Sequence, residues 1–135
     1  MSVALRIERR TIVFKIEKNK ILVNRGDFGI IDFRIPLDAT TDYTFEVGDV
    51  ISFGVYPTSQ YEKVPLIYKE IKIEEEGITS VEIVLESEDT KIGNIINKPV
   101  QYWYEIQLNK EQTVLGYDKD GPKIFMLYPE GSDIR

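Results

Sequence analysis

Alternation of apolar and polar side chains along nearly the whole chain constrains the fold more than any other feature of the sequence. Successive side chains of a β-strand point to opposite faces, so a period of two predicts strands with one buried and one solvated face. The alternating segments are short and are bounded by glycine, proline, asparagine and aspartate, which is typical of turns. No window carries a helical apolar stripe of three turns or more. The sequence therefore predicts an all-β fold.

The predicted strands each have one apolar face. In the segment 100–108, for example, Tyr102 and Tyr104 lie on the face opposite to Gln101 and Glu105. The segments expected to form strands are 11–17, 21–23, 30–36, 50–56, 64–73, 79–86, 100–108, 112–117 and 123–128. The side chains expected in the core are Ile12, Phe14, Ile16, Ile31, Phe33, Ile35, Ile51, Phe53, Val55, Val81, Ile83, Leu85, Val100, Tyr102, Tyr104, Ile106 and Leu108. This pattern predicts an antiparallel, immunoglobulin-like β-sandwich of about eight or nine strands.

The connections between these segments carry turn signals. Residues 74–77 are interpreted as the tip of a hairpin, in which Gly77 supplies a positive φ angle. Residues 118–122 predict a second hairpin tip, which would pair 112–117 with 123–128. This second tip contains Asp118 and Asp120 but lacks the third spaced oxygen ligand and the distal glutamate of a calcium loop. The segment 87–98 lacks strand periodicity and is compatible with one helical turn.

The length indicates a single domain. The chain has 135 residues, close to the commonest domain size, and no long polar stretch divides it. Apolar residues make up 42% and charged residues 30%, so the composition is that of a globular chain and not of a disordered one. We assign residues 1–135 to one domain, with a basic N-terminal strand or arm at 1–24 and a sandwich body at 25–131.

The residue inventory excludes most catalytic designs, because the chain has no cysteine and no histidine. Thiolate nucleophiles and zinc–thiolate sites need cysteine, and a triad base or an imidazole metal ligand needs histidine. A pair of carboxylates remains, but the acidic residues fall mainly at outward strand positions and hairpin tips. We therefore expect no enzyme, no catalytic residue, no cofactor and no metal. An enzyme that works through carboxylates alone is the weakest of three candidate functions.

Charge is distributed unevenly along the chain. Residues 1–25 contain seven basic and two acidic residues, a net charge of +5, and because the whole chain carries −6 the remainder carries −11. A basic strand on an acidic body suits head-to-tail contact between copies, since complementary fields orient association. Arg6, Arg9 and Arg10 are therefore interface candidates; alternatively, these side chains only solvate an edge strand and discourage aggregation. Nucleic acid is not an expected partner, because the acidic body repels phosphate.

Trp103, the only tryptophan, is the fourth interface candidate. The alternation that buries Tyr102 and Tyr104 turns Trp103 outward, among glutamine and glutamate side chains. Tryptophan is a common binding anchor, because its large apolar surface is rarely left wet. Either a partner protein or a sugar ring covers Trp103, or a terminal segment of the chain itself does.

The sequence contains no apolar run near the roughly 20 residues that a membrane-spanning helix needs. The N-terminal segment MSVALRIERR has too short an apolar stretch and the wrong charge order for a secretory signal. We therefore expect synthesis in a cytoplasm and no membrane partner.

A series of motifs runs through residues 24–131. A Gly-Asp turn opens a strand, an aspartate–threonine loop follows an apolar strand, and a tyrosine-rich strand leads to a terminal hairpin. The motifs are RGDFG at 25–29, FEVGDVISFGV at 45–55, LIYKEI at 66–71, EIVLESEDT at 82–90, QYWYEIQL at 101–108 and TVLGYDKDGPKIFMLYPEG at 113–131. Their order resembles small β-sandwich structural proteins of tailed bacteriophages of Gram-positive hosts, including the N-terminal domain of baseplate upper proteins. One departure lies at 92–99, where IGNIINKP replaces a short Leu-Gly turn.

The resemblance implies a non-enzymatic virion component, present in several copies and fixed to other phage structural proteins by its strands and terminal arm. It implies synthesis in the bacterial host cytoplasm and a final location in the virion, on the tail, the baseplate or the capsid surface. The alternative is a carbohydrate-binding module that recognises host cell-wall sugars through Trp103 and nearby tyrosines. The two functions differ in the partner of Trp103, which is a protein in the first and a glycan in the second.

Overall fold

The computed structural model describes residues 4–7, 15–17, 19–58, 64–116 and 121–132. These residues form ten strands and no helix. The strands are β1 (Ala4–Ile7), β2 (Lys15–Glu17), β3 (Lys20–Asn24), β4 (Gly29–Arg34), β5 (Val50–Tyr56), β6 (Ile67–Lys72), β7 (Val81–Leu85), β8 (Val100–Leu108), β9 (Gln112–Leu115) and β10 (Lys123–Tyr128). The prediction of an all-β fold is confirmed for the described part of the chain, which accordingly offers no helix able to cross a membrane.

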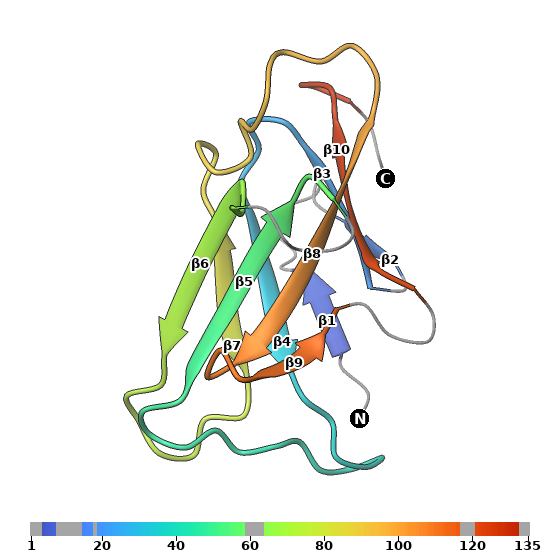
Figure 1. Cartoon of the computed structure of the whole chain (residues 1–135). Helices are drawn as coiled ribbons and strands as arrows, with labels where there is room; N and C mark the ends of the chain where they lie inside the picture. Colours follow the sequence, from blue (N-terminus) through green and yellow to red (C-terminus); the bar gives the residue numbers. More distant parts are fainter. Residues whose placement is uncertain (1–3, 8–14, 18, 59–63, 117–120, 133–135) are drawn as a thin grey trace.

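The strands form two sheets, and Figure 1 shows β5, β6 and β8 in front of β4 and β7. The smaller sheet has the strand order β1-β4-β7, and both of its pairs are antiparallel. The larger sheet has the order β2-β3-β10-β8-β5-β6, and β9 pairs with β8. The pair of β3 and β10 is parallel, unlike the purely antiparallel pairing that the sequence predicts. Two parallel neighbouring strands need a long connection between them, and here residues 25–122 form that connection.

The apolar core contains side chains of both sheets. Phe33 of β4 and Phe53 of β5 are fully buried, and the ring of Phe53 lies 5.7 Å from that of Tyr104, measured between centroids. Predicted core residues that are buried are Ile31, Phe33, Ile35, Ile51, Phe53, Val55, Val81, Ile83, Leu85, Tyr104 and Ile106, with Tyr102 and Leu108 packed against them. Burying one such side chain contributes about 1.5–3 kcal/mol, so this cluster is the main source of stability. Ile12 and Phe14 lie outside the described residues.

The basic N-terminal segment contributes strands to both sheets. β1 pairs with β4, so that Arg6 lies opposite Asp32, and β2 pairs with β3. β3 lies between β2 and β10, and its Ile21 and Val23 are fully buried. β3, which was predicted to belong to the N-terminal strand or arm at 1–24, therefore contributes two side chains to the core.

Two predicted hairpins are wrong, because their strands pair with other partners. Gly77 has the predicted positive φ angle, 81°. However, β6 pairs with β5 and β7 pairs with β4, so the segment 73–80 passes from one sheet to the other. Likewise β9 pairs with β8 and not with β10, after a turn in which Asn109 and Lys110 have positive φ angles. The segment 87–98 contains turns in place of the predicted helical turn. Alternation identified these strands but could not identify their neighbours.

Candidate functional site

Trp103 lies on the face of the larger sheet that points away from the core. Its Cα partners are Tyr56 of β5 and Ile124 of β10. The adjacent row of the same face places Met126 of β10 beside Leu22 of β3. We call these five side chains the outer apolar band. The band crosses four neighbouring strands, β5, β8, β10 and β3, although the sequence predicts a mainly polar face here.

The outer apolar band is less exposed than alternation predicts. Tyr56 and Leu22 are each 8% exposed, and Trp103, Ile124 and Met126 are half-buried. Trp103 therefore points outward, as the sequence indicates, but it is not a fully exposed ring. Partly exposed apolar side chains on a sheet face offer surface that a partner protein can cover.

Gly54 positions Tyr56 on this face. A Cβ atom on Gly54 would lie 2.8 Å from both the Cε2 atom and the hydroxyl oxygen of Tyr56, so the ring of Tyr56 lies directly over the glycine backbone. Glycine within a strand often marks such a close approach. Alternation alone does not single out Tyr56, and the sequence signal that could have revealed it is Gly54 inside an apolar strand.

Glu105 lies beside Tyr56, between that ring and the β9 end of the sheet. The Tyr56 hydroxyl donates to Glu105 Oε1 at 3.4 Å, and a Cβ atom on Gly116 would lie 3.3 Å from the Cβ atom of Glu105. Partial burial raises the pKa of Glu105, and the hydrogen bond from Tyr56 only partly offsets this effect. Among the residues that the structure describes, no second carboxylate contributes to the shift. Glu105 thus provides a hydrogen-bond acceptor on the face.

Tyr68 forms the exposed end of the same face. It is the Cα partner of Gly54 and is 45% exposed. Its hydroxyl donates to Glu70 Oε2 at 2.6 Å, and Lys110 Nζ lies 2.7 Å from the same carboxylate oxygen. Burial and the hydrogen bond to Glu70 raise the pKa of Tyr68, while the contacts with Lys110 and Tyr68 lower the pKa of Glu70. Three aromatic side chains, each with polar neighbours, therefore share one sheet face.

Asp49 is a buried carboxylate whose hydrogen bonds connect two turns of the larger sheet. It accepts hydrogen bonds from the Glu46 backbone N–H at 2.8 Å, from Asn109 Nδ2 at 3.0 Å and from the Tyr43 hydroxyl at 3.3 Å. Burial alone would raise the pKa of Asp49, but these hydrogen bonds together leave it lowered. Asp49 fastens the turn before β5 to the turn after β8. Within the described ranges, no group of three or more acidic side chains is arranged to hold a metal ion.

Of the predicted basic interface candidates, only Arg6 belongs to the part of the chain that the structure describes. Arg6 belongs to β1 of the smaller sheet, whereas Trp103 belongs to β8 of the larger one. Arg9 and Arg10 lie outside the described residues. The structure thus describes the surroundings of Trp103, while the interface prediction for the three arginines stays a prediction.

Comparisons of the chain with protein-family models, with curated proteins and with solved structures find no match. The resemblance to phage structural proteins therefore rests on the order of the sequence motifs.

Proposed function

We propose that this chain is a non-enzymatic structural protein of a tailed-bacteriophage virion, which assembles with copies of itself and with other phage structural proteins. In this proposal its two sheets form an immunoglobulin-like sandwich that is antiparallel except where β3 meets β10. The motif order through residues 25–131 supports the phage family. The outer apolar band supports the mode of action, which is binding through a sheet face.

The outer apolar band is the observation that carries the proposal. Interface centres are depleted in charged residues and enriched in tryptophan, tyrosine and methionine. Trp103, Tyr56 and Met126 are of these types and lie on adjacent strands of one face. A partner that covers the band would remove the remaining exposed apolar surface from water, which favours association by about 25 cal/mol for each Å².

The test is the molar mass of the purified protein, measured by size-exclusion chromatography with light scattering. We expect the native chain to form a multimer and Trp103→Ala to shift it toward the monomer, because truncation of a central aromatic anchor costs more than about 2 kcal/mol of binding. The matched control is Ile95→Ala, which removes an apolar side chain that is 84% exposed in a connection away from the band. This control should leave the mass unchanged.

A native chain that remains monomeric at all concentrations and binds cell-wall glycan through Trp103 would reject the proposal. An equal loss of assembly in the Trp103→Ala and Ile95→Ala variants would also contradict it, since the effect would then not belong to the band. Circular dichroism of each variant checks that the strands are retained.

The second candidate function, glycan recognition, is favoured by one observation. Tyr68 and Trp103 present aromatic rings on the same face, and the Glu70 carboxylate beside Tyr68 provides polar contacts of the kind that sugars use. Trp103 is the only tryptophan, so its fluorescence reports on this face alone. Titration with Gram-positive cell-wall glycan should leave that emission unchanged if the face binds protein. A glycan-dependent shift that disappears in Tyr68→Ala would support the second function.

A further inference from the structure

In the part of the chain that the structure describes, each of the two sheets ends in an edge strand on the same side of the molecule. β6 is the last strand of the larger sheet and β7 is the last strand of the smaller one. Figure 1 shows the two strands side by side, joined by the segment 73–80 below them. Among the described residues, no strand pairs with β6 on the side opposite to β5. An edge of this kind can accept an added strand.

The hydrogen-bond alternation of β5 and β6 shows which backbone groups are available at this edge. The N–H of Ile73 donates to the Asp49 carbonyl, while the Val50 carbonyl accepts from the N–H of Asn109 after β8. Even-numbered residues of β5 thus bond toward β8 and odd-numbered ones toward β6. The residues of β6 whose backbone N–H and C=O groups consequently point to the open edge are Tyr68, Glu70 and Lys72.

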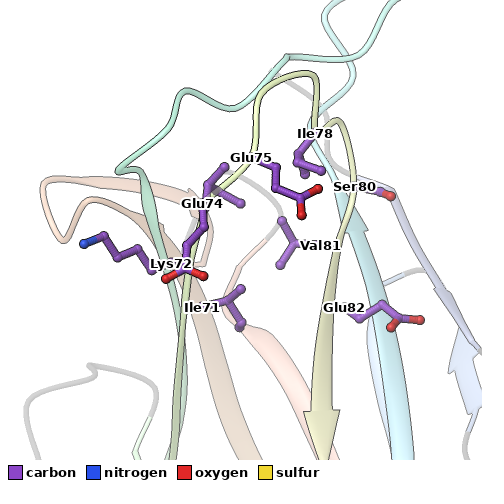
Figure 2. Close-up of a pocket in the computed structure, with 9 residues that line it drawn as sticks. Ile71, Lys72, Glu74, Glu75, Ile78, Ser80, Val81 and Glu82 are labelled. Carbon is purple, nitrogen blue, oxygen red and sulfur yellow. The ribbon is translucent and has the colours of Figure 1, made fainter.

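A cleft of about 350 Å³ lies between the ends of these two edge strands. Figure 2 shows Ile71 of β6 and Val81 of β7 between the strands, and Ile78 above them. Ile73 also lines this apolar floor and is almost fully buried, as is Val81. The cleft is therefore large enough for one or two side chains and is apolar at its base.

The rim of the cleft is acidic. Its exposed carboxylates come from Glu74, Glu75 and Glu82, and the one basic lining residue, Lys72, points away from the floor in Figure 2. At neutral pH three glutamates and one lysine leave the rim negative, in agreement with the acidic body of the chain. Such a rim attracts a cationic segment and repels an anionic one.

Lys69 protects the part of the β6 edge that lies farther from the cleft. Its Nζ atom lies 2.7 Å from Asp89 Oδ2, in the connection that follows β7. A charged side chain on the inward-facing side of an edge strand is a common protection against unwanted strand pairing. The part of β6 next to the cleft lacks this protection, so the access is confined to residues 70–73.

From these observations we propose that the cleft between β6 and β7 binds an extended segment of a partner protein in which lysine or arginine alternates with apolar residues. The segment adds as a strand to the edge of β6, places an apolar side chain against Ile71 and Val81, and directs its cationic side chains to Glu75 and the neighbouring carboxylates. This site is separate from the outer apolar band, and the proposal does not depend on the proposed function.

The test uses the full-length protein and a fluorescein-labelled peptide in which lysine alternates with valine, with binding followed by fluorescence anisotropy. We expect binding that weakens as salt is raised, because the rim contribution is electrostatic. A peptide with glutamate in place of lysine should not bind. Glu75→Lys should weaken binding of the lysine peptide roughly tenfold, which corresponds to the loss of one charge-assisted contact.

Lys72→Pro is the sharpest variant, because it removes an N–H that points to the open edge and leaves the hydrogen bonds between β5 and β6 intact. Lys72→Ala is the matched control, since it also removes the side chain but keeps the N–H. We expect roughly a tenfold loss of affinity for the proline variant relative to the alanine variant. Thermal unfolding of both variants checks that the sheet is retained.

Three outcomes would overturn the proposal. In the first, neither Glu75→Lys nor Lys72→Pro changes binding of the lysine peptide. In the second, the lysine and glutamate peptides bind equally. In the third, Lys72→Pro lowers the molar mass of the protein alone while the peptide does not bind, in which case the occupant of the edge is a second copy of this chain. Trp103→Ala should leave peptide binding unchanged, so failure of this proposal is distinguishable from failure of the proposed function.

Discussion

Glu105 shows how a position assigned to water by strand alternation can acquire an altered chemistry. Its side chain points away from the core, yet the ring of Tyr56 and the backbone of Gly116 shield it. Both neighbours approach closely because Gly54 and Gly116 have no side chains. The carboxylate consequently loses part of its hydration, which raises its pKa above the ordinary value of 4.5.

The raised pKa of Glu105 predicts a particular pH dependence of stability. A carboxyl group whose pKa is higher in the folded chain than in the unfolded chain opposes folding once it ionises. Its contribution therefore falls as the pH rises from 4.5 through the higher folded value. We expect Glu105→Gln to be more stable than the native chain near neutral pH and equal to it below about pH 4.

Urea unfolding of the native and Glu105→Gln chains across this pH range provides the measurement. Glu82→Gln is the matched control, because Glu82 is exposed on β7 and makes the same change of charge. If the difference between the native and Glu105→Gln chains does not vary with pH, the carboxylate does not have the raised pKa on which the prediction depends.

The long connection between β7 and β8 illustrates how an element without periodicity is held in place. Thr90 is fully buried, and its hydroxyl accepts from the Gly26 N–H and donates to the Asp27 carbonyl, both at 2.9 Å. Arg25 adds a hydrogen bond to the Gly93 carbonyl at 3.1 Å and an ion pair with Glu130 at 2.8 Å. The side chains of Thr90 and Arg25 thus make hydrogen bonds that hold this connection in place, where a strand would be held by backbone hydrogen bonds to its neighbours.

Thr90→Val should destabilise the protein by about 1–3 kcal/mol, because it removes the partner of the partly buried Gly26 N–H and Asp27 carbonyl while it keeps the shape of the side chain. The free energy of unfolding from urea titration is the measurement. Thr79→Val, at an exposed position of the connection before β7, is the control and should change stability by less than about 0.5 kcal/mol. Equal effects of the two substitutions would contradict this account of the connection.

Strand positions were predictable from the sequence because burial on one face imposes a period of two. β4, β5, β7 and β8 follow the expected ranges closely, and the predicted inward residues of β4, β5 and β7 are buried. In β8 Tyr104 and Ile106 are buried, whereas Val100, Tyr102 and Leu108, near its ends, are only partly buried. Pairing was not predictable, because the same alternation fits any neighbour. The positive φ angles of Asn109 and Lys110 bring β9 back onto β8, a choice made by polar residues with no strong turn signature. The approach of Tyr56 to Glu105 depends on the pairing of β5 with β8, so it too was hidden.

At the scale of the whole molecule, the basic N-terminal segment and the acidic remainder both contribute strands to the same two sheets. β1 belongs to the smaller sheet and β2 and β3 to the larger one, although residues 1–25 carry +5 and the rest carries −11. The separation of charge along the chain is therefore not a separation into two bodies. It is a pattern on one body, and such a pattern can orient one copy against another.

The double substitution Arg9→Glu and Arg10→Glu should weaken assembly at low ionic strength if the basic segment contacts an acidic neighbour. The effect should shrink as salt approaches about 1 M, where the Debye length falls to about 3 Å. Light scattering at several salt concentrations is the measurement. The matched control, Lys91→Glu with Lys98→Glu, makes the same change of net charge outside the basic segment. Unchanged assembly of the first variant at low salt would count against this contact.

The parallel pair of β3 and β10 has a consequence for how the protein is made. Ile21 pairs with Phe125, so β3 waits during synthesis for a strand that lies far along the chain from it. Until β10 is made, β2 is the one described strand that pairs with β3. The apolar side chains Ile21 and Val23, which are buried in the folded chain, then remain exposed. Pairings between such distant segments form slowly, because the loop that they close is long. Completion of the larger sheet thus requires synthesis of β10, and a chain interrupted before β10 would leave the apolar face of β3 without its parallel neighbour.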